Sequence, residues 1–246
     1  MIIDFHAHIG LSKAFQGRKY TSEKVIEMMD KCGIDMSVLI PTASTPNPEP
    51  FKDVVEAVEK YPGRFIGFVL INPKLNNALD ILEEAVTKYG LRGIKIHTTF
   101  MAVAADDEQL VYPIVKKAGE IGIPVMIHSG QSPWGTPWQV GLTALDNPNV
   151  TIVMAHMGLD EIVYMDAAIK MAKRAPNLIL ETAGITAEDY IARAVNEIGP
   201  ERVVYGSDLL SHNPMVEMEK VKRANISEDA KRLILGDNAK RLFNIT

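Results

Sequence analysis

The chain of 246 residues carries 26 lysines and arginines against 31 aspartates and glutamates, with six histidines and one cysteine. This length fits one large domain or two small ones, and α/β barrels often reach it as a single domain. Because Cys32 has no second cysteine to pair with, an intramolecular disulfide, a thiolate zinc site and an iron–sulfur cluster are excluded. The net charge of −5 argues against a protein that binds nucleic-acid phosphates, which would need a basic surface.

The hydropathy pattern shows neither a targeting sequence nor a membrane segment. Charge interrupts the first apolar run at Asp4, and the longest apolar stretches, such as residues 65–71, are too short to span a bilayer. We therefore expect a cytoplasmic protein that acts on a small-molecule substrate, without a nucleic-acid or membrane partner. The sequence is compatible with a homo-oligomer.

Eight short apolar runs, bounded by turn residues, follow one another along the chain. They are residues 2–6, 36–40, 65–71, 93–97, 124–128, 151–156, 178–181 and 203–206. Near-continuous apolar runs are typical of parallel strands that are covered on both faces. Between them, apolar residues recur at the i, i+3, i+4 spacing of amphipathic helices, as at Val25, Met28 and Met29.

Eight strands that alternate with helices over about 250 residues predict an α/β fold, a single (β/α)8 TIM barrel domain over residues 1–246. An open doubly wound sheet also alternates, but it more often has a glycine-rich phosphate loop after its first strand, where residues 6–10 read His-Ala-His-Ile-Gly. A short C-terminal helical extension follows the barrel. Ser227 is its candidate N-cap, Gly236 a candidate stop, and Asp237 the candidate cap of a last helix.

The six histidines share one predicted face of the barrel. In a TIM barrel, the C-terminal ends of the strands and the loops after them form the catalytic face. All six lie at strand ends or in those loops: His6, His8, His97, His128, His156 and His212. His212, in the loop after the last strand, either contacts substrate or caps the next helix.

Three of these histidines and one aspartate form a candidate metal site. His6 and His8 are two residues apart on a strand, so both imidazoles lie on one side and can bind one ion. His128 adds a third nitrogen, and Asp208 adds a carboxylate beside the first strand once the barrel closes. The alternative to a metal site is that the histidines are hydrogen-bonded core residues and that Asp208 is an ordinary turn residue. Asp4 shares the predicted face of His6 but lies deeper, and we interpret it as structural or as a support for the ligands.

Three further residues are placed beside this site. His156 is another ligand or a free imidazole that acts as base or electrophile, unless it is a buried histidine bonded to the backbone. Lys95 and His97 share an inward face of the fourth strand, where an unpaired lysine is costly. Lys95 therefore forms an ion pair with a core carboxylate, contacts a substrate carboxylate, or forms a carbamate that bridges two metals.

Loop residues supply weaker candidates for substrate binding. Arg18, with Lys13 and Lys19, could hold a carboxylate, although a solvated loop explains these charges equally well. Trp134 and Trp138 could wall a pocket for a flat substrate, or else pack on neighbouring loops or at an oligomer contact.

The motif set resembles the amidohydrolase superfamily of metal-dependent barrels, in its amidohydrolase-2 branch. This branch includes aminocarboxymuconate-semialdehyde decarboxylase-like proteins and predicted hydrolases. The resemblance covers residues 2 to about 243 and rests on Asp4-Phe5-His6-Ala7-His8, residues 93–97, Ala155-His156-Met157-Gly158, Tyr205-Gly206-Ser207-Asp208 and the ending LGDNAKRLF.

The resemblance implies one Zn²⁺ or similar ion held by His6, His8, His128 and Asp208, with His156 unligated. Elsewhere in the superfamily, a carbamylated lysine on strand four bridges two metals. Lys95 stands at that position, so a binuclear site is the alternative, and Lys95 and His97 are candidates for a second metal or for substrate.

Together these features predict a metal-dependent hydrolase. The ion lowers the pKa of bound water toward about 7, and the hydroxide attacks an ester, lactone or amide carbonyl polarised by the metal or by His156. Asp208 passes the proton to the leaving group. One alternative is non-oxidative decarboxylation of an aromatic or unsaturated acid. The resemblance implies that decarboxylases of this branch are longer than this chain. The other is a barrel that binds metal without turnover, which would not need His156.

Overall fold

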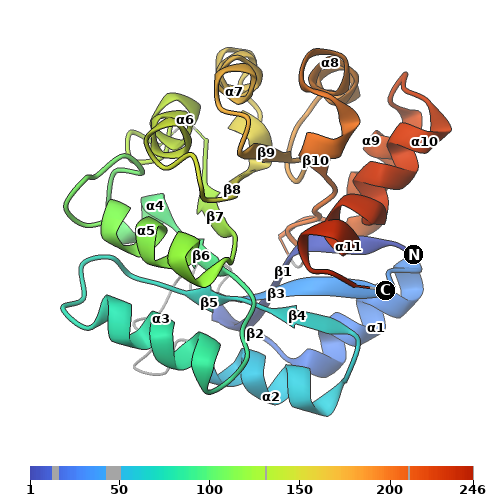
Figure 1. Cartoon of the computed structure of the whole chain (residues 1–246). Helices are drawn as coiled ribbons and strands as arrows, with labels where there is room; N and C mark the ends of the chain where they lie inside the picture. Colours follow the sequence, from blue (N-terminus) through green and yellow to red (C-terminus); the bar gives the residue numbers. More distant parts are fainter. Residues whose placement is uncertain (13–16, 43–50, 131, 210, 246) are drawn as a thin grey trace.

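The computed structural model describes residues 1–12, 17–42, 51–130, 132–209 and 211–245. Lys13 lies outside these residues. Figure 1 shows the strands at the centre of the molecule and the longer helices around them. Within the described residues, no helix combines the length and apolar character that a membrane crossing requires.

The strands form two sheets that meet at two seams. The first sheet has the order β2-β1-β3-β4 and the second β10-β9-β8-β7-β6-β5. Every neighbouring pair is parallel except β1 and β2. The strands are β1 (Ile3–Ser12), β2 (Arg18–Tyr20), β3 (Met36–Pro41), β4 (Phe65–Gly67), β5 (Val69–Leu70), β6 (Ile94–Ile96), β7 (Val125–His128), β8 (Ile152–Ala155), β9 (Leu178–Glu181) and β10 (Val203–Val204).

Backbone hydrogen bonds continue across both seams between the sheets. At one seam, the amide of Phe68 donates to Leu39 and the amide of Val69 donates to the carbonyl of Gly93, at 3.0 Å each. At the other, the amide of Phe5 donates to the carbonyl of Tyr205 at 2.8 Å. The strands therefore follow one another around a ring, which confirms the predicted TIM barrel.

Each predicted strand is present, and two differ in form from the prediction. Residues 65–71 are divided into β4 and β5, because Phe68 turns from one sheet to the other. β1 is longer than residues 2–6 and continues past His6 and His8 to Ser12, where Gly10, Leu11 and Ser12 pair with β2. The sequence predicts a loop here, whereas the antiparallel pairing satisfies the backbone of this segment as a strand.

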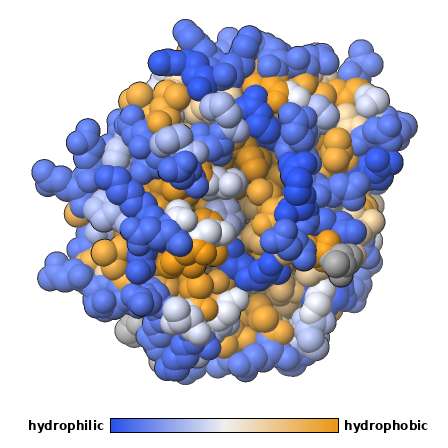
Figure 2. Space-filling view, viewed as in Figure 1, coloured by the Kyte–Doolittle hydropathy of each residue, from blue (hydrophilic) through white to orange (hydrophobic). Residues whose placement is uncertain are grey.

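Eight helices surround the strands and bury their apolar stripes against them. They are α1 (Ser22–Cys32), α2 (Lys52–Lys60), α3 (Ala78–Thr87), α5 (Tyr112–Ile121), α6 (Pro137–Asp146), α7 (Ile162–Arg174), α8 (Glu188–Ile198) and α9 (Pro214–Arg223). Capping fixes several starts: Thr136 and Gln139 form a capping box at α6, and Pro113 stands in the first turn of α5. In the view of Figure 2, hydrophilic residues cover most of the periphery and hydrophobic residues gather toward the centre.

The end of the chain closes the N-terminal end of the barrel. Phe243, just after α11 (Asn238–Leu242), stacks on Phe5 with ring centroids 5.5 Å apart and meets the edge of Phe68. Its backbone oxygen accepts a hydrogen bond from Arg92. The interior therefore has an apolar floor at this end of the strands.

The C-terminal extension differs from the prediction in how its helices join. Ser227 caps α10 (Glu228–Arg232) as expected, accepting from the amide of Ala230 at 3.2 Å. The expectation that Gly236 stops a helix is wrong, because the chain runs through a π-helical turn (Leu233–Asp237) into α11. A Cβ at Gly236 would lie 2.2 Å from the carbonyl oxygen of Met1, so glycine allows close packing here. The side chain of Asp237 makes no capping hydrogen bond.

Candidate metal centre

Three of the four predicted ligands meet at the closing seam of the barrel. The Nε2 atoms of His6 and His8 are 3.1 Å apart. Asp208 follows β10 and places Oδ1 3.0 Å from Nε2 of His8 and 3.7 Å from Nε2 of His6. These side chains form one of two groups among the described residues whose donor atoms lie within 4.8 Å of one another.

The hydrogen bonds of His6 determine which of its nitrogens faces this group. Nδ1 lies 3.1 Å from Oε2 of the buried Glu181, so the ring donates its proton there. Burial, followed by the charge of Lys95, lowers the pKa of His6 well below its usual range, so the imidazole is neutral. Nε2 therefore carries a lone pair that points toward His8 and Asp208.

The donor set fits a divalent cation. Two imidazole nitrogens and a carboxylate oxygen are ligands that Zn²⁺ and similar ions take, and a carboxylate behind a ligating histidine is typical of such sites. Nδ1 of His8 is buried without a hydrogen-bond partner among the described residues. Nitrogen and oxygen lone pairs at these short separations repel one another unless a proton or a metal lies between them.

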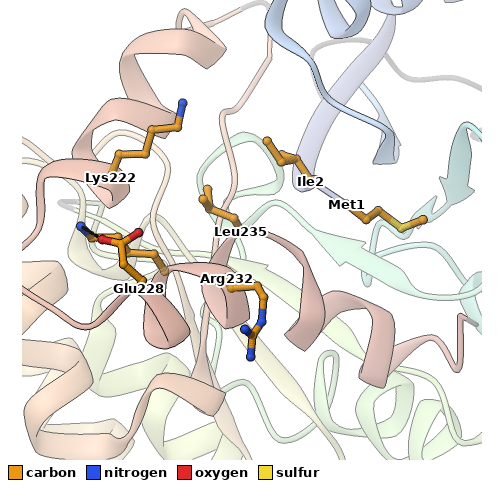
Figure 3. Close-up of a pocket in the computed structure, with 7 residues that line it drawn as sticks. Met1, Ile2, Lys222, Glu228, Arg232 and Leu235 are labelled. Carbon is orange, nitrogen blue, oxygen red and sulfur yellow. Dashed lines mark hydrogen bonds and ion pairs between the residues drawn. The ribbon is translucent and has the colours of Figure 1, made fainter.

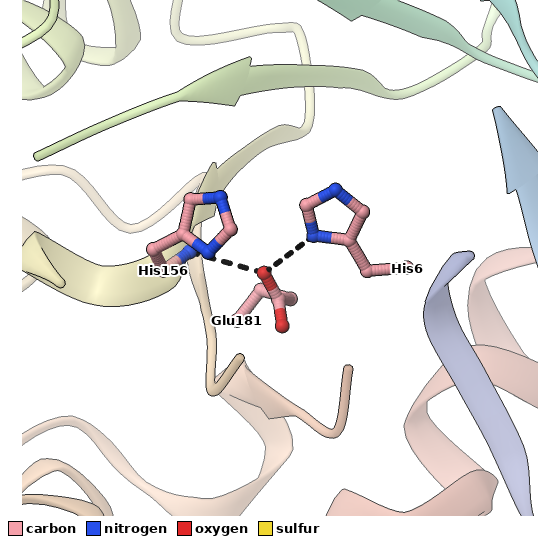
Figure 4. Close-up of side chains that lie close together, drawn as sticks. All are labelled: His6, His156 and Glu181. Carbon is pink, nitrogen blue, oxygen red and sulfur yellow. Dashed lines mark hydrogen bonds and ion pairs between the residues drawn. The ribbon is translucent and has the colours of Figure 1, made fainter. Parts of the chain in front are cut away.

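Glu181 is a site residue that the sequence analysis did not identify. It ends β9 and, as Figure 4 shows, its carboxylate lies between His6 and His156. Oε2 accepts from Nδ1 of His6 at 3.1 Å and from the backbone amide of His156 at 3.0 Å, and Oε1 accepts from the amide of Ala183 at 2.5 Å. The available signal was an acidic residue at the end of an otherwise apolar run. Burial raises the pKa of Glu181, against the opposing effects of His156 and these hydrogen bonds.

His156 lies beside the group on a strained turn. Its Nδ1 is 3.0 Å from the carbonyl oxygen of Ala183, to which it donates, so Nε2 carries the lone pair. Burial lowers the pKa of this imidazole, which is therefore neutral near pH 7. The 3-10 turn His156–Gly158 begins with φ of 69° at His156 and 31° at Met157, and Asp208 also has a positive φ of 49°. Non-glycine residues rarely adopt this backbone, and such strain concentrates at functional sites.

His128, the fourth predicted ligand, lies farther along the wall of the site. It does not belong to either close group of donor atoms. Its ring centroid is 4.9 Å from that of His156, and it stacks on His97 at 4.0 Å with an interplanar angle of 15°. Phe100 continues this row beyond His97, at 4.2 Å. A row of flat rings thus leads from the buried His156 toward Phe100, which is 54% exposed.

Lys95 faces the centre from β6. Its Nζ lies 3.2 Å from Nε2 of His6, and it is the one lysine or arginine among the buried side chains of the described residues. Burial lowers its pKa to about 8, although Asp208 and Glu181 act in the opposite direction. Among the described residues no carboxylate pairs directly with Lys95, so the core ion pair, one of the three alternatives for this lysine, is not present there. The contact with His6 places it within the site.

The predicted loop residues lie at the periphery. Arg18 and Lys19 have exposed side chains on β2. Trp134 and Trp138 are each 41% exposed, and Trp138 packs edge-on against Tyr164 of α7. His212 is 40% exposed, with Nδ1 3.6 Å from Oδ2 of Asp208, so it lies at the rim of the centre.

Asp4 lies behind the ligands rather than among them. Its carboxylate is fully buried and accepts hydrogen bonds from the backbone of His6 and from Ser207. Burial raises its pKa to about 7, although the hydrogen bonds from Ser207 lower it. The structure thus agrees with a supporting role for Asp4.

A separate cleft of about 510 Å³ lies beside the start of β1 and has none of the histidines (Figure 3). It is lined by Met1, Ile2, Lys222, Glu228, Lys231, Arg232 and Leu235. Its cations have acidic neighbours: Lys231 lies 2.8 Å from Glu228, and Arg232 lies 2.9 Å from Asp229. We therefore assign the functional site to the histidine end of the barrel.

The fold and the site define an α/β barrel with a histidine–carboxylate centre at the C-terminal ends of its strands. The chain belongs to the amidohydrolase family, in its amidohydrolase-2 branch, since that family's model matches residues 3–245. No curated protein matches the sequence.

Solved structures with the same barrel include enzymes of different reactions. An uncharacterised TIM-barrel protein from Bordetella bronchiseptica is 21% identical, with a TM-score of 0.82 over 99% of this chain and 98% of that chain. A dihydroxybenzoic acid decarboxylase from Polaromonas, with bound manganese and an inhibitor, is 18% identical, with a TM-score of 0.75 over 99% and 97%. A probable 2-pyrone-4,6-dicarboxylic acid hydrolase from Acinetobacter baumannii, with citric acid bound, is 15% identical, with a TM-score of 0.74 over 99% of each chain. These likenesses establish the fold.

Proposed function

We propose that this protein is a metal-dependent hydrolase that cleaves an ester, lactone or amide bond of a small molecule. The observation that carries the proposal is the convergence of His6, His8 and Asp208, with the neutral His156 beside them. The ion that we propose is a single Zn²⁺, held by these three residues and, after a movement of its ring, by His128. The bound manganese of the Polaromonas enzyme supports a divalent ion in this fold.

The side chains divide the chemistry among them. When bound, the ion supplies Lewis acidity, which makes water nucleophilic near neutral pH. Asp208 accepts a proton from the attacking water and passes it to the leaving group. His156 donates through Nδ1 to the carbonyl of Ala183, so Nε2 of the neutral ring is free to accept the proton that the carboxylic acid product releases. Glu181 holds the ring of His6 in place.

Decarboxylation of an aromatic or unsaturated acid is the second candidate. The buried Lys95 beside His6 supplies a cation that can bind a substrate carboxylate, and the row of rings from His156 to Phe100 suits a flat substrate. Chain length does not distinguish a hydrolase from a decarboxylase here, because this chain aligns with 97% of the length of the Polaromonas decarboxylase. We favour hydrolysis, because Arg18 and Lys19, the other candidate cations, have exposed side chains on β2.

A binuclear centre is the alternative to a single ion. It requires Lys95 to bridge two metals as a carbamate, with histidines such as His97, His128 and His156 on the second ion. We favour one ion, because His6, His8 and Asp208 converge on one point. Metal analysis of the purified protein tests this directly, with about one ion per chain expected for our proposal and two for the alternative.

The reaction is tested with two substrate panels and one variant. We expect the zinc-loaded protein to hydrolyse members of an ester and lactone panel and to release no carbon dioxide from aromatic acids. His156→Asn should keep the metal and lose turnover. Release of carbon dioxide with an inert ester panel would establish the decarboxylase instead, and a gently purified protein that binds no divalent metal would refute both candidates.

A further inference from the structure

Strand β1 contains one more residue than its partner β3 in the segment that carries the first histidine. Asp4 pairs with Ser37 and Ala7 pairs with Leu39, so three steps along β1 match two steps along β3. This mismatch is a β-bulge, which leaves one residue of the longer strand outside the regular ladder.

The bulge changes which residues face the inside of the barrel. Before it, Ile3 and Phe5 belong to the interior apolar cluster, whereas after it Ala7 and Ile9 pack in the cluster beneath the helices. In a regular strand, alternate residues keep to one face, so odd-numbered residues would remain inside. His6 and His8 would then point toward the helices, away from Asp208 and Lys95. The bulge therefore brings both imidazoles into the site.

A single side chain holds the bulge and a second ligand-bearing segment together. Oδ1 of Asp4 accepts from the backbone amide of His6 at 3.0 Å and from that of Ser207 at 2.8 Å. Its Oδ2 accepts from the hydroxyl of Ser207 at 2.5 Å, and the carboxylate is fully buried. Ser207 immediately precedes Asp208, whose backbone has the strained φ of 49°.

We propose that Asp4 is a positioning residue for the metal centre, whose carboxylate fixes the β1 bulge and the Ser207–Asp208 turn and so brings His6, His8 and Asp208 to one point. This inference rests on the proposed metal-dependent function. Asp4 acts through the backbone and contacts no ligand atom. Its partners are the backbone amide of His6, which the bulge removes from the ladder, and Ser207, which precedes the carboxylate ligand Asp208.

The test measures the affinity of the metal-stripped full chain for Zn²⁺ by calorimetric titration. Asp4→Ala should raise the dissociation constant by about 10- to 100-fold, as loss of a residue that orients metal ligands does. Asp4→Asn should restore the affinity to within about threefold of wild type, because its amide oxygen still accepts from both backbone amides while its NH2 donates to Ser207. Unchanged affinity in Asp4→Ala, or equal losses in both variants, would overturn the proposal.

A matched control separates positioning from general stability. Asn238 is also fully buried and donates to the backbone carbonyls of Pro200 and Val203, at 2.7 and 2.8 Å, near the floor of the barrel. Asn238→Ala should lower the melting temperature of the metal-free protein and leave the Zn²⁺ affinity unchanged. If Asp4→Ala does not fold, Ser207→Ala, which removes the hydroxyl donor, should weaken Zn²⁺ binding by a smaller factor, and unchanged affinity would contradict the inference.

The outcome for Asp4 can be distinguished from that for the proposed function. If wild type binds no divalent metal, the proposed function fails, and crystal structures of the metal-free proteins still test Asp4. Loss of the bulge in Asp4→Ala, with His6 turned out of the barrel, supports the assignment. A retained bulge with His6 in its wild-type position overturns it.

Discussion

At the scale of single residues, Glu181 orients two histidines that the sequence motifs identify. Both of its carboxylate oxygens accept hydrogen bonds from N–H groups: Oε2 from His6 and His156, and Oε1 from Ala183. Gly206 leaves room for this carboxylate, because a Cβ there would lie 2.1 Å from Oε1. The site therefore depends on a carboxylate at position 181 and on the absence of a side chain at position 206.

Glu181→Gln should weaken metal binding by about 10- to 100-fold, as measured by Zn²⁺ titration. An amide must turn its NH2 group toward an existing N–H donor, either at Ala183 or at His6 and His156, so the hydrogen-bond set cannot be preserved. Glu217→Gln is the matched control, because Glu217 is also buried and accepts from the amide of Gly184 outside the ligand group. Equal effects of the two substitutions would contradict a specific role for Glu181.

Gly206→Ala should reduce Zn²⁺ affinity by displacing the Glu181 carboxylate. The effect should disappear in a Glu181→Ala background, where the atoms that the new methyl group meets are absent. A double-mutant cycle with the four proteins measures this coupling directly. Additive losses in the cycle would show that Gly206 acts on the site by another route.

At the scale of elements, the C-terminal helices serve the barrel floor rather than the site. Phe243 fills the interior between Phe5 and Phe68, and Arg92 binds its carbonyl oxygen. Gly236 lets the preceding π-helical turn pack directly on the backbone of Met1. The C-terminal motif that contributes to the family resemblance is thus explained by packing.

Phe243→Ala should lower the free energy of unfolding by about 3–5 kcal/mol, because it leaves a cavity in the barrel floor. Urea unfolding of the metal-free protein measures the loss. Phe100→Ala, at a position that is 54% exposed, should cost much less. Zn²⁺ affinity should be unchanged in Phe243→Ala, and a large loss of affinity would show that the floor and the site are coupled.

At the scale of the whole molecule, the candidate metal centre spans the seam that closes the barrel. His6 and His8 come from β1, the first strand, and Asp208 follows β10, the last. Hydrogen bonds from Phe5 to Tyr205 and from Leu209 to His6 join the same two segments. A metal bound here would link the two ends of the barrel and stabilise its closed form.

Removal of the metal should therefore lower stability. A ligand that binds only the folded state adds about 2.7 kcal/mol at a free concentration one hundred times its dissociation constant. Thermal unfolding in excess Zn²⁺ and in chelator should differ accordingly, and His8→Ala should abolish most of the difference. If His8→Ala keeps the full zinc-dependent shift, the ion binds elsewhere on the protein.

The sequence by itself determined the barrel and most of the candidate site. Apolar periodicity reports on local structure, so the eight strands, the surrounding helices and the strand-end positions of His128, His156 and Asp208 followed from it. It did not show the β1–β2 hairpin, the π-helical turn or the roles of Glu181 and Gly206. It also placed Asp4 and His6 on one face, because alternation along a regular strand includes no bulge.

Only the tertiary structure decided which polar groups face one another. The contact of Asp4 with Ser207 joins residues 203 positions apart, and that of His6 with Glu181 joins residues 175 positions apart. A hydrogen bond requires a donor–acceptor distance within a few tenths of an ångström of its optimum, and this geometry depends on register, bulges and ring closure together. Periodicity specifies the face on which a residue lies, whereas the assembled barrel fixes the distances on which metal binding depends.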